Sequence, residues 1–160
     1  EGAPKGLARE FVELKLQSCI LQYDVCAEMV GFIRNKPTGF ATAVALKGLV
    51  LRLYEYDRLM NTTFIPRLLA LAKSRNVHFD TTTVKKIRTQ WKTELKHLRQ
   101  WSDVRNQAAG HYSKDFKSQV ALLKRLDPDE VMTVTKAFLR FNMALLVGLR
   151  DTGRGIRSDA

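Results

Sequence analysis

Apolar residues recur three and four positions apart along most of the chain, and no stretch of any length alternates with a period of two. This spacing places side chains on one stripe of an α-helix. It predicts helices over residues 8–33 and 40–60, a shorter one that ends near Arg75, and a long one over residues 80–109. A short amphipathic piece begins within residues 113–116, and a last helix ends near Arg150 with an apolar stripe of Val131, Val134, Phe138, Phe141, Leu145 and Leu149.

Turn and capping signals separate these patterns. Residues 35–39 contain proline and glycine, and Asn61-Thr62-Thr63 offers N-cap candidates before the helix that ends near Arg75. Asp127-Pro128-Asp129-Glu130 is the clearest boundary, with an aspartate at the N-cap, proline at the first helical position and glutamate as in a capping box. The sequence therefore predicts an all-α antiparallel bundle of five to six helices. One domain over residues 8–150 is expected, with flexible termini at 1–7 and 151–160.

The long helix predicted over residues 80–109 carries the candidate chemistry. Its core stripe reads Val84, Ile87, Trp91, Leu95, Leu98, Ser102 and then Arg105. A guanidinium in such a row is costly to bury without an anionic partner. Gly110 is a natural helix stop, and His111 follows it directly. The break at Gly110 is expected to bring Arg105 and His111 together, because six residues of continuous helix would place them on different faces.

Charge supports a polyanionic partner. The formal net charge is +11, and residues 80–126 hold eleven Lys or Arg against four Asp or Glu, which gives +7. A basic segment of this kind is typical of nucleic-acid contact, with an anionic membrane surface as the second reading. The residues expected to contact the phosphate backbone are the basic face of residues 85–99, including Lys92 and Arg99, and also Lys114 and Lys117.

Other chemistries lack support. The chain has no glycine-rich phosphate loop, no HExxH and no CxxC pair, and its three histidines at 78, 97 and 111 are scattered, so no metal or cofactor is expected.

His97 is expected to be an exposed helical residue, and Glu55 and Asp57 face different directions on their helix. Cys19 and Cys26 are too far apart along a helix for a disulfide and are expected to be small buried residues. With no apolar run expected to span a membrane and no signal-peptide pattern, the predicted location is cytoplasmic.

The segment from Arg105 to His111 resembles the motif of the HEPN superfamily (higher eukaryotes and prokaryotes nucleotide-binding), whose ribonuclease members carry arginine, four to six residues, and histidine. Here five residues intervene, and Asn106 is a polar residue of the kind common after that arginine. The resemblance covers roughly residues 8–150. It implies a metal-independent endoribonuclease, a toxin or defence component, in which two subunits pair and each contributes its motif to a shared cleft. RNA, a second copy of the chain and a restraining antitoxin or regulatory protein are the implied partners.

In that reading Arg105 stabilises the phosphate, His111 handles the proton, and Asn106 orients one of them. Tyr112 follows the histidine directly, whereas some relatives have tyrosine two positions after it; Tyr112 is kept as an RNA-contact candidate. Three alternatives stay open. The domain is a non-catalytic module that binds nucleic acid, nucleotide or a protein partner, or it is a plain interaction bundle that does not bind nucleic acid at physiological salt. In the third, Arg105 pairs with Asp103, Asp115 or a core-facing acid such as Glu28, and His111 caps the helix.

Overall fold

The chain is an all-α bundle, as the sequence predicts. The computed structural model describes residues 5–109 and 116–158. Within these ranges it contains no strand, and the helical segments in order are α1 Lys5–Asn35, α2 Phe40–Leu59, the π-helix η1 Met60–Phe64, α3 Ile65–Ser74, α4 Thr81–Thr89, α5 Lys92–Gln100, the π-helix η2 Val104–Ala109, α6 Phe116–Leu123 and α7 Pro128–Ser158.

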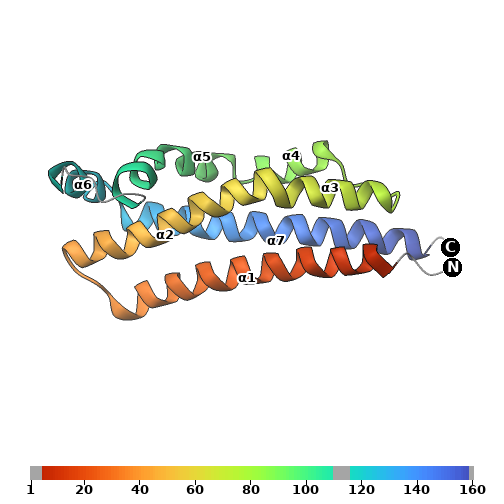
Figure 1. Cartoon of the computed structure of the whole chain (residues 1–160), viewed down its shortest axis with the longest axis horizontal. Coiled ribbons are helices and arrows are strands. Elements are labelled where there is room, and N and C mark those ends of the chain that lie inside the picture. The colour runs from red at the N-terminus through yellow and green to blue at the C-terminus, as the bar shows by residue number, and fades with distance from the viewer. Residues whose placement is uncertain (1–4, 110–115, 159–160) are drawn as a thin grey trace.

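Three long helical stretches set the shape (Figure 1). α1, the stretch from α2 to α3, and α7 run side by side, α4 and α5 lie along the upper side in this view, and α6 lies at one end. α7 packs against α1, α2, α4 and α5, and all six residues of its predicted apolar stripe are buried. Phe138, Phe141 and Leu145 are each at most 2% exposed, so α7 forms the middle of the core.

The break predicted at Asn61-Thr62-Thr63 is wrong, because α2, η1 and α3 follow one another without a gap. Instead of capping a new helix, the Asn61 amide donates to the Asp57 carbonyl and the Thr62 hydroxyl donates to the Arg58 carbonyl. Met60 and Phe64 are fully buried, and that burial holds the chain in helical conformation through polar residues. Counting this stretch as one and η2 as the continuation of α5, the described residues form six helices, in agreement with the predicted five to six.

The long helix predicted over residues 80–109 is interrupted. Asp80 caps α4 by accepting the Thr83 backbone N–H, as expected, but α4 ends at Thr89 and α5 begins at Lys92. At the break the Trp91 ring packs edge-on against Phe141, with 6.5 Å between ring centroids. The break rotates the stripe that follows, so that Trp101 and Val104 are buried while Ser102 is only half-buried.

The last helix differs from the prediction in two respects. α7 continues to Ser158, past the expected end near Arg150. Its segment from Pro128 to Asp151 could also cross a membrane, judged by length and composition alone. The sequence pattern had predicted no run of this kind. That segment carries the buried stripe at the centre of the bundle, which is the usual position of the core helix of a helical domain.

A buried polar pair joins α1 to α7. The Ser18 hydroxyl donates to the Asn142 side-chain oxygen at 2.9 Å, and the Asn142 amide reaches the Ser18 carbonyl at 3.5 Å. Both residues are at most 1% exposed. A buried polar group that loses its partner carries its full desolvation penalty.

We therefore expect Ser18→Ala to lower the free energy of unfolding by about 1–3 kcal/mol, because the buried side-chain oxygen of Asn142 loses the Ser18 hydroxyl that donates to it. Urea unfolding followed by circular dichroism measures the change, with the exposed Thr93→Ala as control. The double variant with Asn142→Leu should lose less than the sum of the two single variants. A Ser18→Ala protein as stable as the wild type would show that the pair contributes nothing.

Candidate nucleic-acid interface

Arg105 is held against α2 by an acid and an aromatic ring. Its Nε donates to Glu55 Oε1 at 3.1 Å, and its guanidinium carbon lies 5.7 Å from the centroid of the Tyr54 ring. Its Nη1 donates to the side-chain oxygen of the neighbouring Asn106 at 3.0 Å. The Arg105 side chain is nevertheless 40% exposed, so it lies at the edge of the core and not inside it.

The sequence indicated that Arg105 needs an anion but not which one. Of the acids considered, Asp115 lies outside the described residues, Asp103 makes no ion pair with a described residue, and Glu28 pairs with Arg52. Glu55 was not predicted as the partner. It lies in the polar part of α2, from Tyr54 to Arg58, and it meets Arg105 only because η2 packs against α2. The signal available in the sequence was an acid set between two tyrosines, Tyr54 and Tyr56.

The Glu55 carboxylate is kept ionised by its neighbours. Partial burial alone would raise its pKa, but hydrogen bonds and charge from Arg105 and Arg58 outweigh burial and hold the pKa below its ordinary value of 4.5. Because the pKa is lower in the folded state, the ionised carboxylate stabilises the fold at a pH above its unfolded-state pKa. This stabilisation is lost as the pH falls through its folded-state pKa. The Glu55–Arg105 pair is therefore intact at neutral pH and weakens only in acid.

The segment that carries Arg105 and Asn106 is a π-helix. η2 runs from Val104 to Ala109, directly before Gly110, and Arg105 N–H bonds the Trp101 carbonyl at 3.1 Å. π-helical turns are rare and occur frequently at functional sites. His111, Tyr112 and Lys114 lie outside the described residues, so the expected meeting of Arg105 with His111 stays a prediction.

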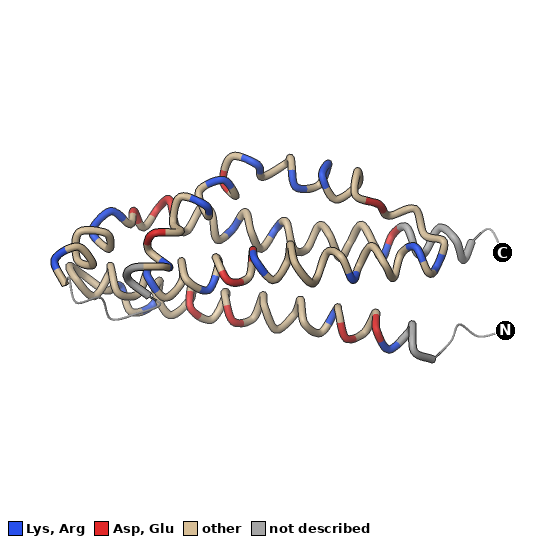
Figure 2. Tube along the Cα trace, turned by 45° about the horizontal axis from the view of Figure 1, so that its top comes forward, with Lys and Arg blue, Asp and Glu red and all other residues tan. Residues whose placement is uncertain are grey.

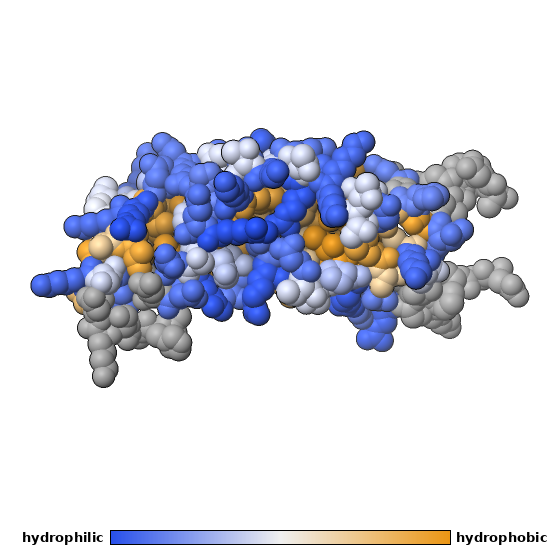
Figure 3. Space-filling model, turned by 90° about the horizontal axis from the view of Figure 1, so that it is seen from above, coloured by the Kyte–Doolittle hydropathy of each residue, from blue (hydrophilic) through white to orange (hydrophobic). Residues whose placement is uncertain are grey.

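A basic groove follows α4 and α5. It has a volume of about 550 Å³ and is lined by Lys85, Arg88, Thr89, Lys92, Leu95, Lys96 and Arg99. Lys and Arg residues follow these helices along the upper edge of Figure 2, and Figure 3 shows hydrophilic side chains over this face with apolar atoms between them.

Most of the cations in this groove are free of carboxylates. Arg88 donates to Asp57 at 2.8 Å and to Asn61 at 2.6 Å and lies 5.4 Å from the Phe141 ring centroid, so it anchors α4 to the core. Lys85, Lys92, Lys96 and Arg99 are exposed, and none of the four forms an ion pair with a described residue. Four unneutralised cations along one groove are a fitting surface for a polyanion.

The predicted contact residues are divided among three places. Lys92 and Arg99 line the groove, Arg105 and Asn106 lie together on η2 outside it, and Lys117 is exposed on α6, which packs against η2. Glu55 and Asp57 face different partners, Arg105 and Arg88, as expected.

Two other expectations about side chains are wrong. His97 is half-buried and its ring contacts Glu130 at the start of α7, because α5 packs against α7. Cys19 is exposed and Cys26 is only partly buried, because α1 turns both toward its outer side.

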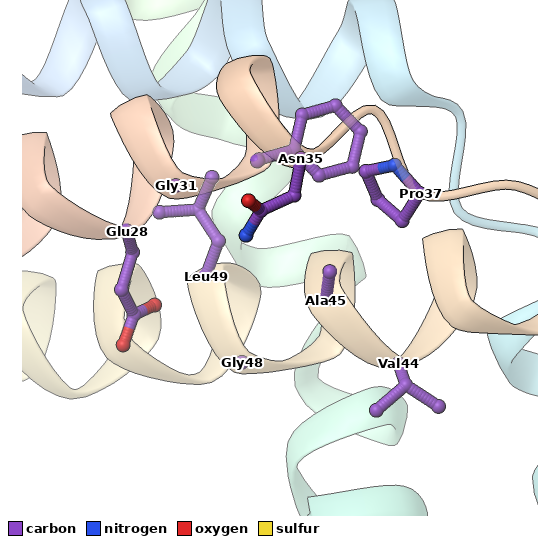
Figure 4. A pocket seen from close by; sticks show the side chains of 9 residues that line it. Glu28, Gly31, Asn35, Pro37, Val44, Ala45, Gly48 and Leu49 are labelled. Atoms are coloured by element: carbon purple, nitrogen blue, oxygen red, sulfur yellow. The ribbon is translucent and has the colours of Figure 1, made fainter.

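A second hollow lies between α1 and α2. It measures about 330 Å³ and is lined mostly by small or apolar residues, with Glu28 and Asn35 as its polar lining residues (Figure 4). Across the described part of the chain, no three His, Cys, Asp or Glu side chains gather in a way that would hold a metal ion.

Comparison with known proteins gives the chain no relatives: no family model, no curated protein and no solved structure matches it.

Removing the anchor of Arg105 should loosen η2. We expect Glu55→Gln to make backbone amides of residues 104–106 exchange hydrogen about two- to five-fold faster, the scale set by a partly exposed ion pair. Hydrogen exchange corrected for intrinsic rates measures this, with Glu94→Gln on α5 as the matched control. In the wild type the extra protection should be lost as the pH falls from 4.5 through the lower folded-state pKa of Glu55, whereas Glu55→Gln should show no such step. Equal exchange in both proteins at neutral pH would refute the anchoring role.

Proposed function

We propose that this chain is a metal-independent endoribonuclease of HEPN type that cleaves RNA through attack of the 2′-hydroxyl. The observation that carries the proposal is the setting of Arg105, a half-exposed guanidinium fixed by Glu55 and Tyr54 on a π-helix just before His111. A toxin or defence role in the cytoplasm belongs to the same proposal.

The setting of Arg105 suits stabilisation of a phosphate. A guanidinium has five N–H donors. Glu55 and Asn106 accept from Nε and Nη1, and the remaining N–H groups of Arg105 bond no described residue. Because Glu55 and Tyr54 fix the guanidinium before RNA binds, its donors need not reorient as negative charge develops on the phosphate. Donors placed in advance in this way lower the activation barrier.

The proposed reaction is a transesterification. The 2′-oxygen forms a bond to phosphorus while the bond from phosphorus to the 5′-oxygen breaks, leaving a 2′,3′-cyclic phosphate and a 5′-hydroxyl. His111 is the group proposed to accept the proton of the 2′-hydroxyl and to return a proton to the leaving 5′-oxygen, a role that suits an imidazole near neutral pH. Arg105 offsets the negative charge that develops on the phosphorane oxygens, and Asn106 orients the phosphate or the histidine.

The groove along α4 and α5 supports RNA as the substrate. Lys85, Lys92, Lys96 and Arg99 would contact phosphates without reading bases, so the grip is independent of sequence. Lys114, Lys117 and Tyr112 would extend this contact beyond η2. A second copy sharing its motif in one cleft and a restraining antitoxin or regulatory protein complete the proposal.

One observation favours a second candidate function. Glu55 and Tyr54 engage Arg105 in the way that a purely structural arginine is engaged, and the groove needs no catalytic residue in order to bind. On this reading the chain is a non-catalytic module that binds nucleic acid. Binding would then persist when His111 is changed, and no cleavage would occur.

The groove residues should carry salt-dependent binding. We expect Lys92→Ala/Lys96→Ala to weaken binding of single-stranded RNA and to reduce the slope of log affinity against log salt by about 0.7 for each lysine removed. Fluorescence anisotropy over a range of salt measures it, with the exposed Lys136→Ala on α7 as control. An unchanged slope in the double variant would place RNA elsewhere.

The catalytic proposal is tested with purified protein and a mixed RNA pool in EDTA. We expect the wild type to yield 2′,3′-cyclic phosphate ends. Cleavage should fall about 10²- to 10³-fold in Arg105→Ala and by about 10²- to 10⁴-fold in His111→Ala. Arg140→Ala, an exposed arginine on α7, is the control, and RNA methylated on the 2′-oxygen should not be cut. Well-folded protein that binds RNA but cuts none of the pool supports the binding module instead.

A further inference from the structure

The outer face of α1 carries an exposed apolar seam. Val12, Leu16, Ile20, Tyr23, Val30 and Ile33 expose between 39% and 75% of their area, although α1 is a core helix on its other side. Together with Cys19 and Cys26, the positions 12, 16, 19, 23, 26, 30 and 33 follow one another in alternating steps of four and three. This is the heptad pattern of a helix that packs against a partner helix.

α1 therefore has two apolar faces. Leu14, Leu21 and Val25 are buried against the bundle, and the seam, which consists of the seven positions above with Ile20 on its flank, lies on the opposite side. α1 lies along the lower edge of the bundle in Figure 1, with α7 and α2 on its upper side. The seam extends over about 32 Å, at 1.5 Å of rise for each residue.

No charge interrupts the seam. Between Leu16 and Ile33 the only charged residues are Asp24 and Glu28. The tube of α1 is mostly tan over this stretch in Figure 2. Both acids are turned toward α2: Glu28 bonds Arg52 at 2.6 Å, and Asp24 accepts from the Tyr56 hydroxyl at 2.8 Å. The charges of this stretch are thus satisfied inside the subunit, which leaves its outer face apolar.

We propose that the seam binds a second copy of this chain, with the two α1 helices antiparallel about a two-fold axis near Tyr23 and Cys26. In this register Leu16 faces Ile33 of the second copy, Cys19 faces Val30, and Tyr23 faces Cys26. A two-fold axis repeats each contact, so one self-complementary face suffices.

The sequence of α1 fits itself in this register. Large residues meet small ones, with Tyr23 opposite Cys26 of the second copy and Ile20 opposite Ala27. At the ends of one flank Glu13 faces Arg34 of the second copy, a pair of opposite charges. On the other flank Gln22 faces Met29, and Lys15 faces Lys36, which lies beyond the end of α1 at Asn35.

The exposed area is of the right size for such a contact. Six large side chains at these exposures present on the order of 600 Å² of apolar surface. This is at the upper end of the range of apolar patch areas on monomeric proteins, and it approaches the ~800 Å² that each partner buries in a standard interface. The seam lies on the opposite side of α1 from the bundle, so this contact is a different one from the shared motif cleft implied by the HEPN resemblance. It rests on neither RNA binding nor cleavage.

Sedimentation equilibrium at tens of micromolar tests the proposal. Because the motif-cleft contact of the proposed function lies elsewhere and can persist, we expect the wild type to have an even multiple of the chain mass of 18.3 kDa, and Leu16→Glu/Tyr23→Glu to have half the wild-type mass. Both side chains are more than half exposed, so the variant should keep the wild-type circular dichroism. Phe116→Glu, which replaces an equally exposed apolar residue on α6, should keep the wild-type mass. A monomeric wild type overturns the proposal, and so does a double variant that keeps the wild-type mass.

Cross-linking tests the antiparallel register. Val30→Cys should form an intermolecular disulfide with Cys19 of the second copy under mild oxidation, and Cys19→Ser in that background should abolish it. Within one helix these positions are about 16 Å apart, too far to bridge. Cross-linking of Cys19 to Cys19 would indicate parallel helices and contradict the register.

A lipid surface is the remaining occupant to exclude. Vesicles of phosphatidylcholine with phosphatidylserine should bind the wild type no better than they bind Leu16→Glu/Tyr23→Glu. Binding that is lost in Leu16→Glu/Tyr23→Glu would overturn the proposal in favour of a membrane. Arg105→Ala and His111→Ala should still lose half of their mass when Leu16→Glu/Tyr23→Glu is added, so failure of the ribonuclease proposal and failure of this one are told apart.

Discussion

Three polar residues of α2 bind side chains of three other segments. Arg52 binds Asp24 and Glu28 on α1, Glu55 binds Arg105 on η2, and Asp57 binds Arg88 on α4. Apolar burial around α7 drives the bundle together, but burial is not directional. The ion pairs are directional and link α1, α4 and η2 to this part of α2, although each contributes only modest energy.

The fold class and the core of the last helix were predictable because helical periodicity reports burial directly. The six apolar positions of α7 and the Asp80 cap of α4 are examples. The continuity of α2 through η1 was not predictable, because Asn61-Thr62-Thr63 is a good cap in isolation and only the burial of Met60 and Phe64 overrides it. The break before α5 likewise depends on the packing of Trp91 against Phe141, a contact between residues far apart in sequence.

For the candidate site, the sequence indicated that Arg105 requires an anion, while Glu55 was identifiable only once η2 was packed on α2. The same limit applies to His97, whose partner Glu130 lies on α7. The basic groove was foreseen as a charged face of residues 85–99, and packing showed that Arg88 is the structural member of that set. His111 lies outside the described residues, so its meeting with Arg105 rests on the motif.

The central claim is that Arg105 and His111 form one site for a phosphate, and NMR of labelled arginine and histidine side chains tests it most directly. The protein is titrated with a short RNA methylated on its 2′-oxygens, which binds without being cut. Arg105 Nε–H and the His111 ring should shift together with one dissociation constant, and His111→Ala should remove the shift of Arg105 at low RNA. Shifts confined to the groove lysines, with Arg105 still bonded to Glu55 and His111 unmoved, would contradict a shared site.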